Sequence, residues 1–251
     1  MELLRTDVLG VGFDDITVQQ AVSRANEIIN GSGKAYIVTP NPEIVWMCRR
    51  NGTLLDAVNE AGLVLPDGVG IIIAASILGT PLHGGRVPGI DFASGLFDIM
   101  AGSGKSVFLL GSKPGVAEQA GRNLAEKYPG LVIAGFSDGY FTDDEPVIEH
   151  INRTNPDLLL VCLGSPKQEL WMASNLLRLN TNLCAGLGGS IDVFAGRAKR
   201  APVFFQRLGL EWFYRLIREP WRIKRMIKLP LFILVVVWKR VTGKAKKRTR
   251  H

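Results

Sequence analysis

Residues 63–78 read LVLPDGVGIIIAASIL. A short apolar run ends at Pro66, Asp67 and Gly68 follow, and a longer apolar run begins at Val69. A short apolar run bounded by Pro and Gly is typical of a buried strand, whereas a run of ten residues favours a helix. The stretch therefore predicts a strand over 63–65, a turn carrying one carboxylate, and a helix over 69–78.

The same alternation of apolar runs and helical patterns continues to residue 196. The other predicted strands are 35–39, 106–111, 131–136, 158–164 and 182–188. The other predicted helices lie near 17–30, 42–59, 89–102, 114–127, 144–153 and 167–179. Continuous apolar strands separated by helices indicate an α/β fold with a mostly parallel sheet and helices on both faces.

Polar or glycine residues stand at the end of several predicted strands. They include Thr39, Asn41, Asp67, Gln168, Gly188 and Gly189. Because the carboxyl ends of parallel strands share one edge of the sheet, where ligands bind, these residues are expected to converge in space. This edge is the predicted functional site.

Asp67 has two interpretations at that edge. It could cap the helix predicted over 69–78, which is a common structural role for Asp before a helix. It could instead act as a general base, because a carboxylate at a sheet edge can take the proton from an attacking hydroxyl group. The residues around it leave both interpretations open.

The remaining candidates suit a polar ligand. Asn41 lies between Pro40 and Pro42, so its amide is held in an extended turn and could bond sugar hydroxyls, although ordinary turn chemistry explains it equally well. Gln168 offers the same amide, but taken alone it is better explained as an exposed first-turn helix residue. Gly188 and Gly189 would let backbone N–H groups approach a phosphate.

Charge divides the chain into two predicted parts. Residues 197–251 hold 17 lysines and arginines and two acids, a net charge of +15, whereas residues 1–196 carry −8. We expect a catalytic body over 1–196 and a basic helical appendage over 197–251. Such asymmetry indicates a polyanionic partner for the appendage, either nucleic acid or an anionic membrane surface.

The appendage favours the membrane surface. Arginines spaced three, four and three apart line one helical face; they are Arg215, Arg218, Arg222 and Arg225. The apolar run 229–238 is too short to span a bilayer and is followed by Lys239 and Arg240, as in interfacial anchors. The alternative is a helix packed on the body with a solvated basic face. Nucleic acid is less favoured, because no recognised nucleic-acid-binding motif accompanies the charge.

Cysteine usage and the first residues indicate the compartment. Cys48, Cys162 and Cys184 are far apart and form no C-x-x-C pair, so neither a zinc site nor a redox pair is predicted. A reducing, cytoplasmic compartment is expected, and the acidic residues near the start do not match a secretion signal. No metal site and no cofactor is predicted.

Eight blocks of sequence occur in the order of a known family. They are TPNPE (39–43), LPDGVG (65–70), RVPGID (86–91), FLLGSKPGVAE (108–118), GYF (139–141), LGSPKQE (163–169), GLGGSIDVFAGRAKRAP (186–202) and GLEWFYRLIREPWR (209–222). Together they resemble the bacterial WecG/TagA/CpsF glycosyltransferases, glycosyltransferase family 26, over about residues 5–240. The resemblance implies a Rossmann-like body and an inverting, metal-independent transferase.

The resemblance also implies substrates and roles. The family moves an N-acetylmannosamine-type sugar from a UDP donor to polyprenyl-diphosphate-linked N-acetylglucosamine during assembly of wall teichoic acid and related surface polysaccharides. The motifs place the catalytic base on Asp67, substrate contacts on Thr39, Asn41 and Gln168, and Arg86 in a neighbouring block. The appendage would bring arginines to the donor diphosphate and dock on the inner face of the cell membrane. Self-association away from the membrane is also implied.

Several questions stay open at the level of sequence. The donor sugar is not fixed, because an acidic sugar could use Arg86 or Lys113 as an extra cation in the pocket. Which appendage arginine reaches the diphosphate is undetermined, as is whether 229–238 inserts into lipid or packs on the body. The alternative function is a non-catalytic, membrane-surface nucleotide-binding module.

Overall fold

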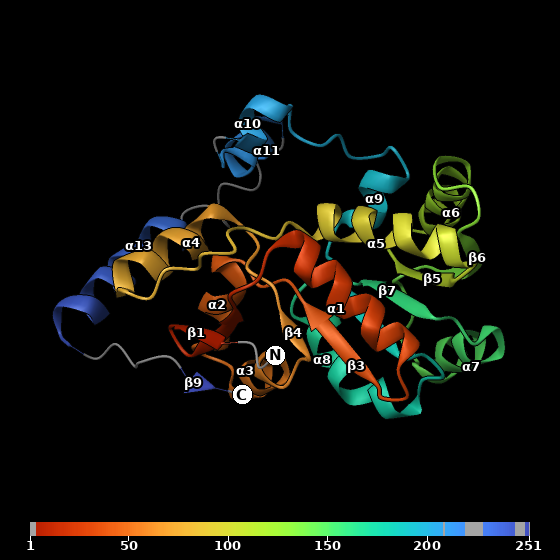
Figure 1. Ribbon diagram of the computed structural model, residues 1–251, viewed down its shortest axis with the longest axis horizontal. Helices are drawn as coiled ribbons and strands as arrows, with labels where there is room; N and C mark the ends of the chain where they lie inside the picture. Colours follow the sequence, from red (N-terminus) through yellow and green to blue (C-terminus); the bar gives the residue numbers. More distant parts are fainter. Residues whose placement is uncertain (1–3, 208, 219–227, 244–248, 251) are drawn as a thin grey trace.

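The computed structural model describes residues 4–207, 209–218, 228–243 and 249–250. At its centre is a six-stranded parallel sheet (Figure 1). Its strands, in order across the sheet, are β4 (Leu63–Val64), β3 (Ala35–Val38), β8 (Leu183–Gly186), β7 (Leu158–Cys162), β5 (Ser106–Gly111) and β6 (Val132–Ser137). All six predicted strands are confirmed, and the sheet is parallel throughout.

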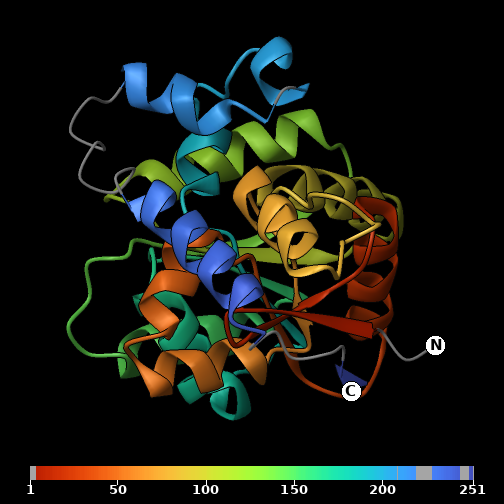
Figure 2. The ribbon, with the colours of Figure 1, turned by 90° about the vertical axis from the view of Figure 1, so that its left-hand side faces the viewer.

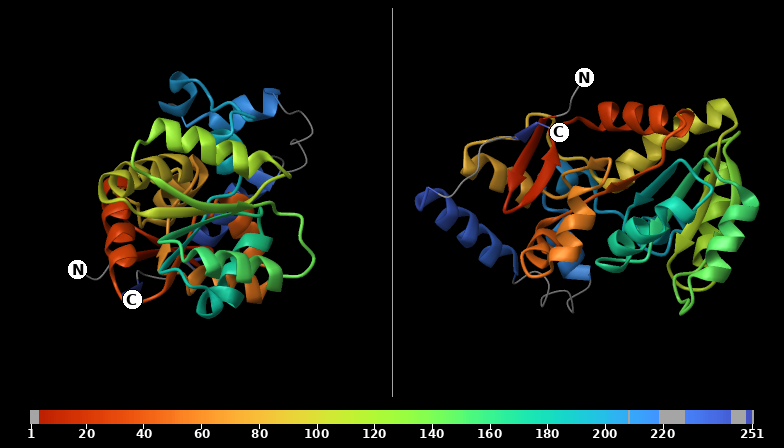
Figure 3. Two further views of the ribbon diagram at one scale, coloured as in Figure 1. Left: turned by 90° about the vertical axis from the view of Figure 1, so that its right-hand side faces the viewer. Right: turned by 90° about the horizontal axis from the view of Figure 1, so that it is seen from below.

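Helices cover both faces of this sheet, as predicted (Figure 3, left). One face is covered by α1 (Val18–Asn30), α5 (Gly89–Ser103), α6 (Val116–Lys127) and α9 (Ser190–Phe194). The other is covered by α2 (Pro42–Cys48), α3 (Gly52–Asn59), α7 (Glu145–Thr154) and α8 (Lys167–Asn175). Helices α4 (Val69–Leu78) and α13 (Lys228–Val241) extend this second core beyond the sheet, where they pack on each other and α13 packs on α2. Strand β5 is apolar on both sides because Leu109 packs into the first core and Phe108 and Leu110 into the second.

Two of the predicted helices differ in extent from the structure. The helix expected over 42–59 is two helices, because Asn51 caps a new one by accepting a hydrogen bond from the Leu54 N–H at 3.0 Å. The helix expected over 167–179 ends at Asn175 and continues as a 3₁₀ turn, η1 (Leu176–Arg178). Helix α9 was not predicted, since its five residues are too few to show a period.

An N-terminal hairpin was also not predicted. Strands β1 (Leu4–Val8) and β2 (Val11–Asp14) pair antiparallel, and β9 (Thr249–Arg250) pairs with β1. Leu9 and Gly10 both have positive φ, 57° and 102°, as a tight two-residue hairpin turn requires. The buried Asp14 accepts from the Val64 N–H at 2.7 Å, so the hairpin holds the edge strand that leads to Asp67.

The basic appendage contributes three of the described helices. Helices α10 (Val203–Arg207) and α11 (Glu211–Arg218) lie beyond the long connection that follows α9, and α13 runs beside α2 and α4 (Figures 1 and 2). Phe232 and Val236 of α13 are fully buried in the second core. The apolar run predicted as an anchor therefore packs on the body with one of its faces.

The three cysteines are buried and unpaired. Burial is the main cause that raises the pKa of the Cys48, Cys162 and Cys184 thiols to about 12. The interpretation of Cys162 and Cys184 as small core residues is therefore confirmed. Thiols this far from ionisation at neutral pH are poor nucleophiles and poor metal ligands.

Candidate active site at the carboxyl edge of the sheet

The loops after β3, β4 and β8 meet at one edge of the sheet. The buried Thr39 hydroxyl donates to the carbonyl of Gly186 at 3.0 Å, which ties the end of β3 to the end of β8. The Asp67 N–H donates to the Pro40 carbonyl at 3.3 Å, which ties the turn after β4 to the turn after β3. The ends of β3, β4 and β8 therefore lie together at one edge of the sheet, as predicted.

Asp67 is half-buried and lies one residue before the helix cap. The cap residue of α4 is Gly68, whose φ of 91° is in a region that side chains rarely adopt. A Cβ atom at Gly68 would lie 3.9 Å from the Asn41 Cβ, so Asp67 is next to a residue that faces Asn41. The interpretation of Asp67 as the N-cap of this helix is therefore wrong, because Gly68 is the cap.

Asn41 is the N-cap of α2. Its Oδ1 accepts from the backbone N–H groups of Glu43 and Ile44 at 2.9 and 3.1 Å. These bonds fix the direction of the amide, so its Nδ2 group is the part that can reach a ligand. The structure thus agrees with both interpretations of Asn41, since the cap that fixes the turn also orients the amide.

Gln168 is 1% exposed, so its interpretation as an exposed first-turn residue is wrong. Its Nε2 donates to Glu169 Oε1 at 2.9 Å, and its Oε1 accepts from the Gly188 N–H at 3.1 Å. Both ends of the Gln168 amide are therefore hydrogen-bonded within the protein, and the Gly188 N–H donates to Gln168. Gly189 next to it is the residue from which α9 begins.

Glu169 is a carboxyl group without solvent exposure. Its Oε1 accepts from Ser165 Oγ at 2.8 Å and from Gln168, while its buried Oε2 has no hydrogen-bond partner among the described residues. Burial raises the pKa of Glu169, and the bonds from Ser165 and Gln168 offset only part of that rise. Sequence reasoning missed this residue, because a Glu in a first helical turn is usually solvated.

Arg86 is at the same edge, beside the Asp67 turn. The neighbouring Val87 N–H donates to the Pro66 carbonyl at 2.9 Å, and the Arg86 guanidinium donates to Glu211 of α11 at 2.9 Å. Arg200 makes two bonds to Asp91, at 2.5 and 2.7 Å. Burial alone would lower the pKa of Arg200, but the bond to Asp91 and the charges of Asp91, Glu211 and Asp67 raise it overall. A cluster of arginines and carboxylates therefore adjoins Asp67.

The four candidate arginines of the appendage are placed unequally. Arg218 is exposed, with its guanidinium 5.9 Å from the centre of the Tyr214 ring. For Arg215 the structure gives its position in α11, four residues after Glu211. Arg222 and Arg225 lie outside the described residues.

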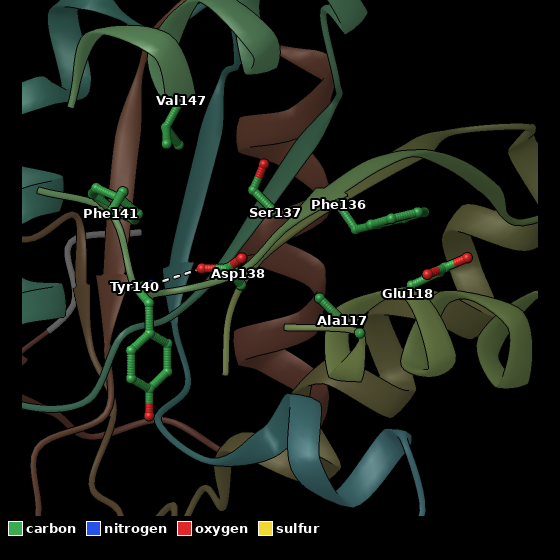
Figure 4. A pocket seen from close by; sticks show the side chains of 9 residues that line it. Ala117, Glu118, Phe136, Ser137, Asp138, Tyr140, Phe141 and Val147 are labelled. Atoms are coloured by element: carbon green, nitrogen blue, oxygen red, sulfur yellow. Dashed lines mark hydrogen bonds between the residues drawn. The ribbon is translucent and has the colours of Figure 1, made fainter. Parts of the chain in front are cut away.

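A cavity of about 450 Å³ opens at the same edge of the sheet, near β5 and β6 (Figure 4). Its lining residues are Gly115, Ala117, Glu118, Phe136, Ser137, Asp138, Tyr140, Phe141 and Val147. Tyr140 and Phe136 are 69% and 41% exposed, and Asp138 Oδ1 accepts from the Tyr140 N–H at 2.8 Å. In Figure 4 Asp138 lies between these two aromatic side chains. The sequence predicted no cavity here, and the block GYF at 139–141 entered only as part of the family resemblance.

The described residues contain neither a cluster of metal ligands nor a helix that could span a membrane. Over residues 4–207, 209–218, 228–243 and 249–250, no group of three or more His, Cys, Asp or Glu side chains could hold a metal ion. Within the same ranges, every helix is too short or too polar to pass through a bilayer.

A parallel sheet with an acid, amides and a cavity gathered at its carboxyl edge has the arrangement of an α/β enzyme. The chain belongs to the family described as glycosyl transferase WecG/TagA/CpsF, whose sequence profile matches residues 6–246. The expected family and the expected Rossmann-like α/β fold are both confirmed.

Three named relatives match most of the chain. A Staphylococcus aureus (strain MW2) protein is 35% identical over 245 residues, which are 96% of this chain and 96% of the relative. A Bacillus subtilis protein is 38% identical over 81% of this chain and 79% of its own length, and a Bacillus spizizenii protein is 36% identical over 86% and 87%. All three are named N-acetylglucosaminyldiphosphoundecaprenol N-acetyl-beta-D-mannosaminyltransferase.

Proposed function

We propose that this chain transfers N-acetylmannosamine, or a closely related sugar, from a UDP donor to N-acetylglucosamine linked to a polyprenyl diphosphate. The product would enter a cell-surface polysaccharide of the wall teichoic acid type. The names of the relatives support the sugar and the acceptor. The observation that carries the proposal is the position of Asp67 beside Asn41 and Arg200 at the carboxyl edge of the sheet.

In the proposed reaction the 4-hydroxyl of the acceptor sugar attacks the anomeric carbon of the donor, with inversion. Asp67 accepts the hydroxyl proton while the bond from the anomeric carbon to UDP breaks. Arginine and backbone donors, rather than a metal, would balance the charge of the departing diphosphate. Asn41 Nδ2 would bond the sugar, whereas Thr39 and Gln168 would hold the loops that frame it.

The cavity at β5 and β6 is suited to the nucleoside of the donor. Its exposed aromatic rings offer flat apolar surface for a base, and Asp138 and Ser137 offer acceptors for hydroxyl or imide donors. Neighbouring parallel strands are ~4.8 Å apart, so the strand order places this cavity roughly 20 Å from the Asp67 turn. A nucleotide sugar seated there would extend its diphosphate past the ends of β7 and β8 toward Asp67.

We expect the protein to act while bound to a membrane surface. Helix α13 leaves large apolar side chains exposed on the face away from the body; they are Leu231, Leu234, Val237, Trp238 and Val241. The sequence after α13 is strongly basic, and each basic residue near an anionic surface adds about 1 kcal/mol of attraction. These features support peripheral binding to the inner face of the cell membrane.

Replacement of Asp67 by Asn tests the function. Loss of a positioned base should reduce kcat by about 10²–10⁴-fold. UDP binding, measured by calorimetry, should change little because the amide keeps the shape of the side chain. Turnover would be followed with a lipid-diphosphate N-acetylglucosamine acceptor and a panel of UDP-sugars, with and without EDTA. A variant with full activity, or activity abolished by EDTA, would contradict the mechanism; UDP binding without turnover by the unmodified chain would favour the non-catalytic module.

A further inference from the structure

The appendage is tied to the body by a partly buried ion pair between residues 125 positions apart. Arg86 donates to Glu211 Oε1 at 2.9 Å, and the two side chains are 20% and 14% exposed. Fully exposed pairs contribute little to stability, because water and salt screen them. A pair this shielded is screened less, so it can fix the position of α11 on the body.

Arg200 extends this contact into a network. Its guanidinium forms two parallel bonds with Asp91 in the first turn of α5, and one of its nitrogens is 3.9 Å from Glu211 Oε1. Paired bonds of this kind fix the plane of a guanidinium as well as its charge. Glu211 therefore contacts Arg86 of the body and Arg200, an appendage arginine that Asp91 of the body holds in place.

The network borders the turn that carries the proposed base. Val87, next to Arg86, is hydrogen-bonded to Pro66, the residue before Asp67. The charge of Asp67 acts on Arg200 together with those of Asp91 and Glu211. A movement of Glu211 would consequently change the positions of Arg86 and Arg200 and the charge around Asp67.

We propose that Glu211 is a positioning residue that docks α11 on the Arg86–Arg200 pair and so places the appendage beside the Asp67 turn. This inference rests on the proposed function. Arg215 and Arg218 follow Glu211 by four and seven residues, or about 6 and 10 Å along the helix at 1.5 Å per residue. Docking through Glu211 sets where this arginine-bearing helix begins relative to the base. In this proposal the appendage contributes to catalysis in two ways: Glu211 positions α11, and the arginines of α11 approach the donor diphosphate.

The test is Glu211→Gln in the full chain, bound to vesicles that contain the lipid-linked acceptor. A hydrogen bond to a charged group contributes enough that its loss should speed hydrogen exchange in residues 203–218 by about tenfold. kcat should fall by a similar factor, while the melting temperature and the KM for the acceptor stay close to those of the unmodified chain. Glu211→Asp, which keeps the charge on a shorter side chain, should recover part of both effects.

Glu27→Gln is the matched control, because it removes one carboxylate from the exposed Arg24–Glu27 pair on α1 and should change neither exchange nor kcat. Asp67→Asn separates the two proposals: it should reduce kcat by about 10²–10⁴-fold yet leave exchange in 203–218 as it was. Unchanged exchange in Glu211→Gln would overturn this inference but would leave the proposed function standing. Faster exchange with an unchanged or higher kcat would also overturn it, because the contact would then restrain the appendage without serving the reaction.

Discussion

The charge state of Glu169 depends on its burial. Because burial raises its pKa above the ordinary value of 4.5, the folded chain holds this proton more tightly than the unfolded chain does. Its contribution to stability is therefore complete at low pH and is lost as pH rises toward the raised pKa. We predict that Glu169→Gln, which cannot ionise, gains melting temperature relative to the unmodified chain as pH rises above the ordinary pKa of 4.5. A difference in melting temperature that does not change with pH would contradict the prediction.

Tyr140 offers a residue-scale test of the nucleoside cavity. Stacking of a base on an aromatic ring is worth about 1–3 kcal/mol by alanine substitution in nucleic-acid complexes. Tyr140→Ala should therefore weaken UDP binding by about 5- to 150-fold, as measured by calorimetry. Phe213→Ala is the matched control, because Phe213 is 42% exposed on α11 and does not line the cavity. Equal losses in the two variants would place the nucleoside elsewhere.

At the residue scale, the sequence predicted positions better than contacts. Thr39, Asn41 and Asp67 could be placed at one edge because parallel strands end together. The burial of Gln168 could not, because it depends on the Gly188 N–H, which only the folded chain brings from the end of β8 to the first turn of α8. The pairing of Arg86 with Glu211 was likewise invisible, since the two residues belong to the body and the appendage.

Helix α13 presents two apolar faces with different partners. Phe232 is fully buried against the body, and Trp238 is 60% exposed on the opposite side. Phe232→Ala should lower the free energy of unfolding by about 3–5 kcal/mol, because it leaves a cavity in the core. Trp238→Ser should leave the melting temperature almost unchanged but weaken binding to anionic vesicles by about tenfold or more, since a large apolar side chain is no longer available to the lipid.

Calorimetry and vesicle sedimentation of the two variants would check this division of α13. If Trp238→Ser lowered the melting temperature as much as Phe232→Ala, the outer face would be a structural surface of the fold. If it kept full vesicle affinity, the anchor would lie outside α13.

The strands were predictable as elements because each is a continuous apolar run that two layers of helices cover. The N-terminal hairpin was not, because its eleven residues alternate weakly and its stability comes from tertiary contacts. Arg5 shows this: it bonds Asp14 and the carbonyls of Asn59 and Ala61, which are far away in the sequence. The break between α2 and α3 needed recognition of Asn51 as a cap inside an apolar pattern.

Over the whole molecule, the charge separation should control where the chain resides. An acidic body with a strongly basic C-terminal part favours one orientation at an anionic surface, with the body held away from the lipid phosphates. Binding to vesicles with anionic lipid should therefore weaken as salt rises from about 0.05 M to about 0.5 M, because the Debye length shrinks below 5 Å. Vesicles of neutral lipid should bind weakly at every salt concentration. Tight binding to nucleic acid with the same salt response and no lipid preference would contradict the membrane assignment.

The hydrogen bond from Val64 to Asp14 has a consequence for assembly. An outermost strand normally presents open N–H groups to which a further strand can be added. In β4 the outward N–H of Val64 is occupied by a buried carboxylate, so the sheet is terminated on the side nearest the proposed base. Lateral growth by strand addition is thereby directed to the opposite margin, at β6, where Val132 and Phe136 are exposed and far from the catalytic turn.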